Sequence, residues 1–133
     1  MKKVFFALAS ILALTGCGQK NSKDIDLVGT WAIEQAMGVS TEKAENHAFI
    51  SFDKEGKVNG NASVNLFFGD YELKGEKLTL SNIGMTKMMG ASMEVEDAIT
   101  DAINTTASIK AKGGKVLVMD SKKKTVMILS KEK

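Results

Sequence analysis

Residues 109–119 read Ile-Lys-Ala-Lys-Gly-Gly-Lys-Val-Leu-Val-Met. Two short stretches with apolar residues, Ile109–Lys112 and Val116–Met119, stand on either side of Gly113-Gly114. A Gly-Gly pair tolerates the positive backbone angles that a tight hairpin turn requires. The stretch therefore predicts a β-hairpin, and with it an antiparallel sheet.

Short apolar stretches separated by turn residues recur along the chain from Ile25 onwards, which is the pattern of successive hairpin neighbours. Asp53-Lys54-Glu55-Gly56 and Lys74-Gly75-Glu76-Lys77 predict two further turns. Lys122-Lys123-Lys124 predicts a solvated turn rather than an anionic-surface patch. The eight predicted strands are Gly29–Glu34, Ala48–Phe52, Val58–Ser63, Tyr71–Leu73, Leu78–Leu80, Ile109–Lys112, Val116–Met119 and Val126–Leu129.

One segment departs from this strand pattern and predicts a helix that packs on the sheet. Its apolar residues at helical spacing are Val95, Ala98, Ile99, Ala102 and Ile103. Ser92 is a candidate N-cap, and Glu94, Glu96 and Asp97 suit the positive end of the helix. The predicted fold class is mainly β. It is an antiparallel sheet or small barrel-like fold of about eight strands, with one helix inserted before the last three strands.

The N-terminal residues have the composition of a secretory signal. Lys2 and Lys3 precede the uncharged stretch Val4–Leu14, and Leu14-Thr15-Gly16-Cys17 follows. The apolar stretch is too short to be read as a membrane-spanning helix, which needs roughly 20 residues. Leu-Thr-Gly-Cys resembles the bacterial lipobox, and this resemblance implies cleavage before Cys17 and lipidation of its thiol.

The sequence divides into three parts. We expect a lipoprotein signal peptide at residues 1–16, a polar tether at residues 17–24 that follows the lipidated cysteine, and one domain at residues 25–133. Acyl chains on Cys17 are expected to hold the protein on a membrane of the cell envelope. Because Gly18 rather than an aspartate follows, the expected location in a Gram-negative cell is the outer membrane, facing the periplasm.

Cysteine usage and charge exclude several kinds of protein. Cys17 is the only cysteine in the chain, so it has no intrachain partner for a disulfide. Once residues 1–16 are removed, sixteen lysines face sixteen acidic residues. This balance lacks the basic footprint of a nucleic-acid-binding protein, and no nucleic-acid partner is expected.

Several stretches of the predicted domain resemble the META domain, which is also the domain of HslJ-like heat-shock lipoproteins. Leu27–Trp31 matches the opening Leu-x-Gly-Thr-Trp, and Ile50–Gly60 matches a strand, turn and glycine. Asn65–Tyr71 and Thr86–Met88, before an acidic helix, match the Asn-x-x-x-Gly-x-Tyr and Thr-x-Met segments. The motif residues, expected to be structural, are Gly29, Thr30, Trp31, Asn65, Gly69, Tyr71, Thr86 and Met88.

The resemblance implies a small, β-barrel-like, stress-associated lipoprotein domain without known catalytic residues. Many relatives have one cysteine just before the asparagine and another just after the Thr-x-Met segment. This chain has Val64 and Gly90 there. Losing both at once is what would be expected if the two thiols pair in those relatives, and this domain must then hold by packing alone.

No catalytic arrangement emerges from the residues. His47 is the only histidine, and it lies near a predicted strand edge without a Gly-x-Ser-x-Gly elbow, so we interpret it as a surface residue. Asp70 and Glu72 share a strand face and could suit acid–base chemistry or a cation, although carboxylates on exposed strands are common. We therefore expect a protein that is not an enzyme and that carries no cofactor.

The methionines and aromatic residues allow two interpretations each. Thioethers of Met85, Met88, Met89 and Met93 could hold Cu(I), but we expect them to fill the core where the helix meets the sheet. We therefore predict no metal site. The aromatic residues interpreted first as core, with a ligand-lined barrel mouth as the alternative, are Trp31, Phe52, Phe67, Phe68 and Tyr71.

Two functional hypotheses remain. The first is a non-enzymatic, stress-associated envelope lipoprotein that acts as an interaction module for a protein partner. The alternative is a carrier or sensor that binds a small apolar ligand inside the barrel. A barrel filled by Phe49, Ile50 and Phe52 has no carrier role, whereas an enclosed apolar void of several hundred cubic ångströms would favour one.

Overall fold

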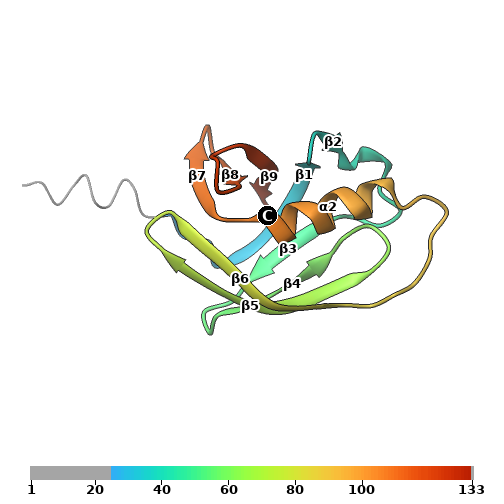
Figure 1. Ribbon diagram of the computed structural model, residues 1–133, viewed down its shortest axis with the longest axis horizontal. Coiled ribbons are helices and arrows are strands. Elements are labelled where there is room, and N and C mark those ends of the chain that lie inside the picture. The colour runs from blue at the N-terminus through green and yellow to red at the C-terminus, as the bar shows by residue number, and fades with distance from the viewer. Residues whose placement is uncertain (1–24, 133) are drawn as a thin grey trace, which may run out of the picture.

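Strands whose alternate side chains point inward close into an antiparallel barrel in the computed structural model, which describes residues 25–132 (Figure 1). In chain order the elements are β1 (Gly29–Ala36), β2 (Val39–Ser40), the 3-10 turn η2 (Thr41–Lys43), β3 (Phe49–Phe52), β4 (Lys57–Asn61), β5 (Leu66–Lys74), β6 (Lys77–Met85), α2 (Glu94–Thr105), β7 (Ser108–Lys112), β8 (Lys115–Met119) and β9 (Thr125–Lys131).

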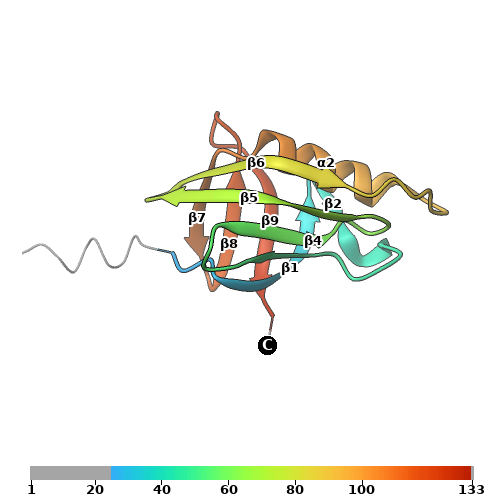
Figure 2. The same cartoon turned by 90° about the horizontal axis from the view of Figure 1, so that it is seen from below.

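Sequence neighbours pair along most of the sheet, and the last strand returns to the first. The strand order is β2-β1-β3-β4-β5-β6-β7-β8-β9, and an additional β1–β9 pairing closes eight strands into a barrel, with β2 as an extra strand (Figure 2). Trp31 of β1 thus lies between Ile50 of β3 and Lys131 of β9. The narrowest seam is β6–β7, where Lys77 and Ser108 form the single registered pair.

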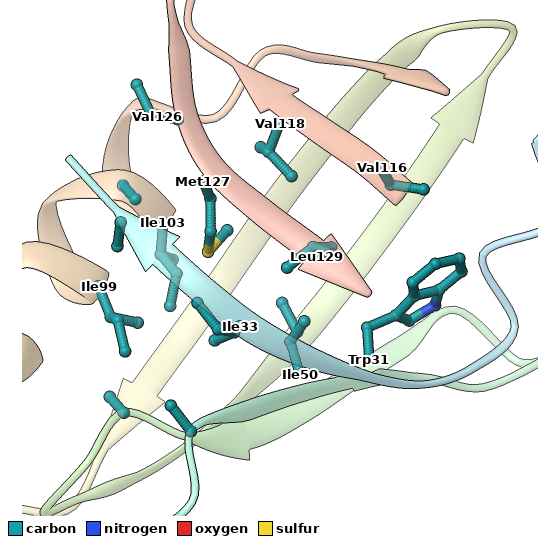
Figure 3. Close-up of a cluster of buried hydrophobic side chains, with 14 of the residues drawn as sticks. Trp31, Ile33, Ile50, Ile99, Ile103, Val116, Val118, Val126, Met127 and Leu129 are labelled. Carbon is teal, nitrogen blue, oxygen red and sulfur yellow. The ribbon is translucent and has the colours of Figure 1, made fainter. Parts of the chain in front are cut away.

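The inside of the barrel is filled with apolar side chains. Figure 3 shows side chains of β1, β3, β8, β9 and α2 gathered in one cluster. Phe52, Phe67, Ile50 and Leu129 are each at most 2 % exposed. All five apolar residues that predicted the helix are buried on α2, which packs against β1, β2 and β9. The predicted mainly β barrel with a helix before its last three strands is confirmed.

Some predicted boundaries were wrong. The structure has six strands before α2 rather than five, because the two-residue β2 pairs with the end of β1. The strand predicted at Tyr71–Leu73 begins at Leu66, and its partner runs on to Met85. A bulge between Phe68 and Asp70, opposite Asn82 with its φ of 53°, shifts the register and interrupts the period-two pattern.

The turn predictions hold. Gly113 and Gly114 adopt φ values of 58° and 82°, as a tight hairpin with two left-handed residues requires. Lys122–Lys124 is an exposed turn. At Gly60, an added Cβ would stand 2.1 Å from the Phe49 carbonyl oxygen and 2.6 Å from the Phe67 ring, so β4 approaches its neighbours too closely there for a larger residue.

The predicted N-cap of the helix was wrong. The N-cap residue is Met93 rather than Ser92, and its side chain makes no capping hydrogen bond. Two backbone groups before α2 are bound by side chains instead, because Ala91 N donates to Glu45 Oε2 at 2.7 Å and Gly90 N to Met93 Sδ at 3.4 Å. The loop before α2 is therefore stabilised by hydrogen bonds to the side chains of Glu45 and Met93 rather than by a capping serine.

The predicted signal peptide, tether and lipidated Cys17 lie outside the described residues. Among residues 25–132, no helix combines the length and the apolar character needed to cross a membrane.

Candidate functional site

The strongest polar cluster surrounds Asn65, which is 2 % exposed and precedes β5. Its Oδ1 accepts hydrogen bonds from Thr86 Oγ1 at 2.8 Å and Met88 N at 2.6 Å. Its Nδ2 donates to the Met88 carbonyl oxygen at 2.9 Å and to Glu96 Oε2. All four hydrogen-bonding positions of the amide are therefore used. Through them Asn65 links the segment that follows β6 with helix α2.

Glu96 is a buried carboxylate on the first turn of α2, only 4 % exposed. Its Oε1 accepts hydrogen bonds from Val64 N at 3.0 Å and Asn65 N at 2.6 Å, and its Oε2 accepts from the Asn65 amide. These N–H groups and the positive helix end offset the cost of burying the charge. Because its oxygens are occupied by this chain, Glu96 has a structural role.

A second set of hydrogen bonds extends the Asn65 cluster to the loop before β3. Buried Ser63 has a φ of 100°, its Oγ accepts from Glu45 N at 2.9 Å, and its carbonyl oxygen accepts from Asn46 Nδ2 at 2.7 Å. Glu45 in turn binds the backbone of Ala91. Three loops and the start of α2 thus form one connected structure at this end of the barrel.

Positions 64 and 90, at which the resemblance implies cysteines in many relatives, lie next to each other within this connected structure. A Cβ placed on Gly90 would stand 2.6 Å from Val64 Cγ2 and 2.5 Å from Glu45 Oε1. Side chains at positions 64 and 90 are therefore neighbours, as the pairing implied by the resemblance requires.

The first motif, Gly29-Thr30-Trp31, lies at the start of β1 and contacts the end of β9. The Trp31 indole is 6 % exposed, and its Nε1 donates to the Leu27 carbonyl oxygen at 2.9 Å. Gly29 has a φ of 128°, and a Cβ there would meet Lys131 Nζ at 2.3 Å. That ammonium lies 4.8 Å from the Trp31 ring centroid, in cation–π distance, and donates to the Val28 carbonyl oxygen at 2.8 Å.

Gly69 lies at the register shift between β5 and β6, and Tyr71 connects β5 to the β3–β4 turn. A Cβ on Gly69 would stand 2.8 Å from the Ser81 carbonyl oxygen, so a larger residue would force the two strands apart. The Tyr71 hydroxyl donates to the Asp53 carbonyl oxygen at 2.5 Å, and its ring meets Phe52 edge to face at 4.9 Å. Partial burial, with Asp53 and Asp26 nearby, raises the pKa of Tyr71.

The residues considered for catalysis do not come together as a site. His47 is exposed and pairs with Glu132. Asp70 binds Lys57 Nζ and Asn82 Nδ2, both at 2.8 Å, and the Lys57 ammonium followed by the Asn82 amide holds the pKa of this carboxyl below its ordinary value. Glu72 lies 3.7 Å from Lys74. Within residues 25–132, no group of three or more His, Cys, Asp or Glu residues is arranged to hold a metal ion.

The structure corrects the core assignment of three residues. Phe68 is 55 % exposed, Met88 54 % and Met89 83 %, so they do not fill the core. Phe68 points outward because β5 alternates and Phe67 takes the inward position, while Met88 is held by its backbone rather than its thioether. The thioethers of Met85 and Met93 accept from Thr100 Oγ1 at 3.8 Å and Gly90 N at 3.4 Å.

These exposed residues lie on β5 and in the segment that directly follows β6. We call the four exposed side chains Leu66, Phe68, Met88 and Met89 the β5–β6 surface. Leu66 is 50 % exposed and exchanges hydrogen bonds with Thr86, whose segment leads directly to the two methionines. Sequence patterning assigned Phe68 to the core because it cannot tell which member of the Phe67-Phe68 pair points inward.

Open depressions mark the surface of the described residues. One, of about 510 Å³, lies on the outer side of β1, β8 and β9. Two others, of about 270 and 290 Å³, lie beside Glu76 and Ser108 and beside Val39 and Glu94. Because the barrel interior is occupied by side chains such as Phe52 and Phe67, the structure does not favour a ligand inside the barrel.

Three solved structures resemble this chain at low identity. One NMR structure has a TM-score of 0.61 and 21 % identity, covering 77 % of this chain and 88 % of the other. A crystal structure of a DUF4847 family protein from Bacteroides vulgatus has a TM-score of 0.57 and 16 % identity. It covers 80 % of this chain and 96 % of its own. An NMR structure of a protein from Burkholderia xenovorans has a TM-score of 0.58 and 14 % identity, and the match covers 99 % of both chains. This likeness shows the fold alone.

No curated protein sequence matches the chain. The family description "META domain" matches residues 25–133, which include every motif residue placed above. The match begins where the sequence pattern places the start of the domain, and the structure shows the barrel with one helix that the resemblance implied. The chain therefore belongs to the META domain family.

Proposed function

We propose that this protein is a lipid-anchored, non-enzymatic envelope lipoprotein whose META domain binds a protein partner through the β5–β6 surface. The observation that carries the proposal is the exposure of Leu66, Phe68, Met88 and Met89, four large apolar side chains at one end of the barrel. Clustered exposed apolar side chains mark interaction sites on protein surfaces.

Two features of the fold support a partner rather than a structural role for this surface. The core is complete without these side chains, because Phe67, Ile99 and Leu129 already fill the barrel with at most 1 % exposure each. The loop that carries Met88 and Met89 lies at one end of the long axis, whereas the described chain begins near the other end (Figures 1 and 2). A domain anchored through its N-terminus would direct this loop away from the membrane.

Anchorage is tested separately from binding. Cells expressing the full chain are labelled with a radioactive fatty acid, and their membranes are isolated. The parent chain is expected to take up label and to remain with the membrane. The Cys17→Ser variant is expected to lose both properties while keeping its fold by circular dichroism. A labelled Cys17→Ser protein would contradict lipidation at this residue.

Partner binding is tested by crosslinking in intact cells. A photoreactive phenylalanine analogue replaces Phe68 or Met89, and in the control it replaces exposed Lys54 in the β3–β4 turn. We expect a defined protein adduct from both surface positions that the Phe68→Ser exchange abolishes at position 89. Identical adducts from position 54, or none from either surface position, would contradict the proposal. An increase in protein level after heat shock would support the stress association.

A further inference from the structure

The depression of about 510 Å³ lies on the outside of the barrel, where β1, β8 and β9 run side by side. Leu117 of β8 pairs with Ile128 of β9, which pairs with Gln35 of β1, and these three residues line the depression. Met37, in the β1–β2 turn and 42 % exposed, adds an apolar wall. We call this depression the β8–β9 trough; its volume is in the range of about 300–1,000 Å³ typical of small-molecule sites.

The walls of the trough carry positive charge without a compensating acid. Lys112 and Lys124 line it, and no Asp or Glu does. In the part of the chain that the structure describes, the four ion pairs use Lys57, Lys74, Lys115 and His47, so neither trough lysine has a carboxylate within 4.0 Å.

Two acids on neighbouring segments, Glu34 and Asp120, have partners of their own. Glu34 of β1 binds Lys115 Nζ at 2.7 Å, and Lys115 lowers the pKa of its carboxyl. Asp120 accepts hydrogen bonds from the backbone N of Lys122 at 2.9 Å and of Lys124 at 3.0 Å. Two ammonium groups on flexible stems therefore stand beside an apolar floor with their charges available to a ligand.

We propose that the β8–β9 trough binds a single-chain fatty carboxylate. Leu117, Ile128 and Met37 contact the hydrocarbon chain, and Lys112 or Lys124 donates charge-assisted hydrogen bonds to the carboxylate. One acyl chain with a small headgroup matches an open trough of this volume, and the lysines supply the charge complement that a neutral amphiphile lacks. The site is on the outside of the barrel and shares no residue with the β5–β6 surface, so it stands independently of the proposed partner.

The test uses the full chain with Cys17→Ser, so that no acyl chain on the protein competes for the trough. Dodecanoate, below its critical micelle concentration, is titrated while the methyl NMR signals of Leu117 and Ile128 are followed, and calorimetry gives the dissociation constant. We expect saturable shifts of these two residues with one site per chain. Dodecanol, which has the same chain and no charge, is expected to bind roughly tenfold more weakly.

Lys112→Gln/Lys124→Gln is expected to weaken dodecanoate binding roughly tenfold and to leave dodecanol binding unchanged. Lys54→Gln/Lys87→Gln removes the same charge from exposed positions outside the trough and should bind like the parent. Equal affinity for dodecanol and dodecanoate, an equal loss in the control, or shifts confined to the β5–β6 surface would overturn the proposal. Binding of dodecyl phosphate without dodecanoate would overturn the carboxylate assignment.

Discussion

Asn65 shows how one side chain connects parts of the chain that are distant in sequence. Its carboxamide bonds Thr86, Met88 and Glu96 while the residue itself is 2 % exposed. Substitution therefore removes more than one contact, because the partners are left in a low-dielectric environment without replacement donors and acceptors.

We expect Asn65→Ala to lower the free energy of unfolding by about 3 kcal/mol, since each buried group left unpaired costs about 1–3 kcal/mol. Urea denaturation measures the change. Asn59→Ala is the matched control, because Asn59 is exposed on β4, and its effect should stay within about 0.5 kcal/mol. Equal losses in the two variants would contradict the role of Asn65.

The Asp70 carboxylate should make the stability of the domain depend on pH. Its folded-state pKa is lowered by Lys57 and Asn82, so its charge contributes stability above the unfolded-state pKa, and the contribution is lost as pH falls through the folded-state pKa. The parent chain should therefore melt at a higher temperature than Asp70→Asn at neutral pH, and the difference should shrink as the pH falls below the ordinary pKa of an aspartate. Glu72→Gln, at a more exposed and looser pair, should show a smaller difference. A gap that persists in acid would contradict this account.

At the scale of elements, the β4–β5 turn and the β6–α2 loop meet at Val64 and Gly90. The resemblance implies cysteines at these positions in many relatives, whereas this chain joins the two segments through Asn65, which bonds Met88, and through Glu45, which bonds Ser63 and Ala91. A side chain at position 90 has little room, because Glu45 Oε1 lies 2.5 Å from the position of a Cβ. Glu45 is exposed and can move aside.

Val64→Cys/Gly90→Cys, made in a Cys17→Ser background, is therefore expected to form a disulfide under oxidising conditions. Closing a loop of about 26 residues contributes about 3.5 kcal/mol by chain entropy, less any strain. Thermal unfolding with and without reductant measures the gain, and thiol titration measures pairing. The single Gly90→Cys variant should be less stable than the parent. Free thiols in the oxidised double variant would show that the two positions do not meet.

At the scale of the whole molecule, the β1–β9 pairing closes the barrel and gives each strand an inner and an outer face. Adjacent residues of β9 illustrate the difference, since Leu129 is fully buried and Ile128 lies in the outer trough. Truncating each of these two side chains to alanine should therefore lower the free energy of unfolding by different amounts, although both residues lie on the same strand.

We expect Leu129→Ala to cost about 3 kcal/mol of unfolding free energy, as cavity-forming core changes do, and Ile128→Ala to cost less than about 1.5 kcal/mol. Chemical denaturation of both variants measures this. Similar costs would mean that the inside and outside of the barrel are not distinguished as described.

The local features were predictable because they depend on neighbours in sequence. The Gly113-Gly114 turn and the apolar stripe of α2 were read from residue type and spacing alone. The motif residues around Asn65 were identified by resemblance, but their hydrogen bonds were not. No spacing rule links Asn65 to Glu96, because the two residues meet through a tertiary contact 31 positions apart.

The sequence by itself determined that this protein is mainly β, where its hairpins turn and which face of its helix is buried, because backbone angles and side-chain periodicity are local properties. Only the tertiary structure decided that Phe67 faces inward and Phe68 outward, that Met88 is held by its backbone, and that Leu117, Ile128 and two lysines share one trough. Those outcomes depend on register and barrel closure, which bring distant strands together.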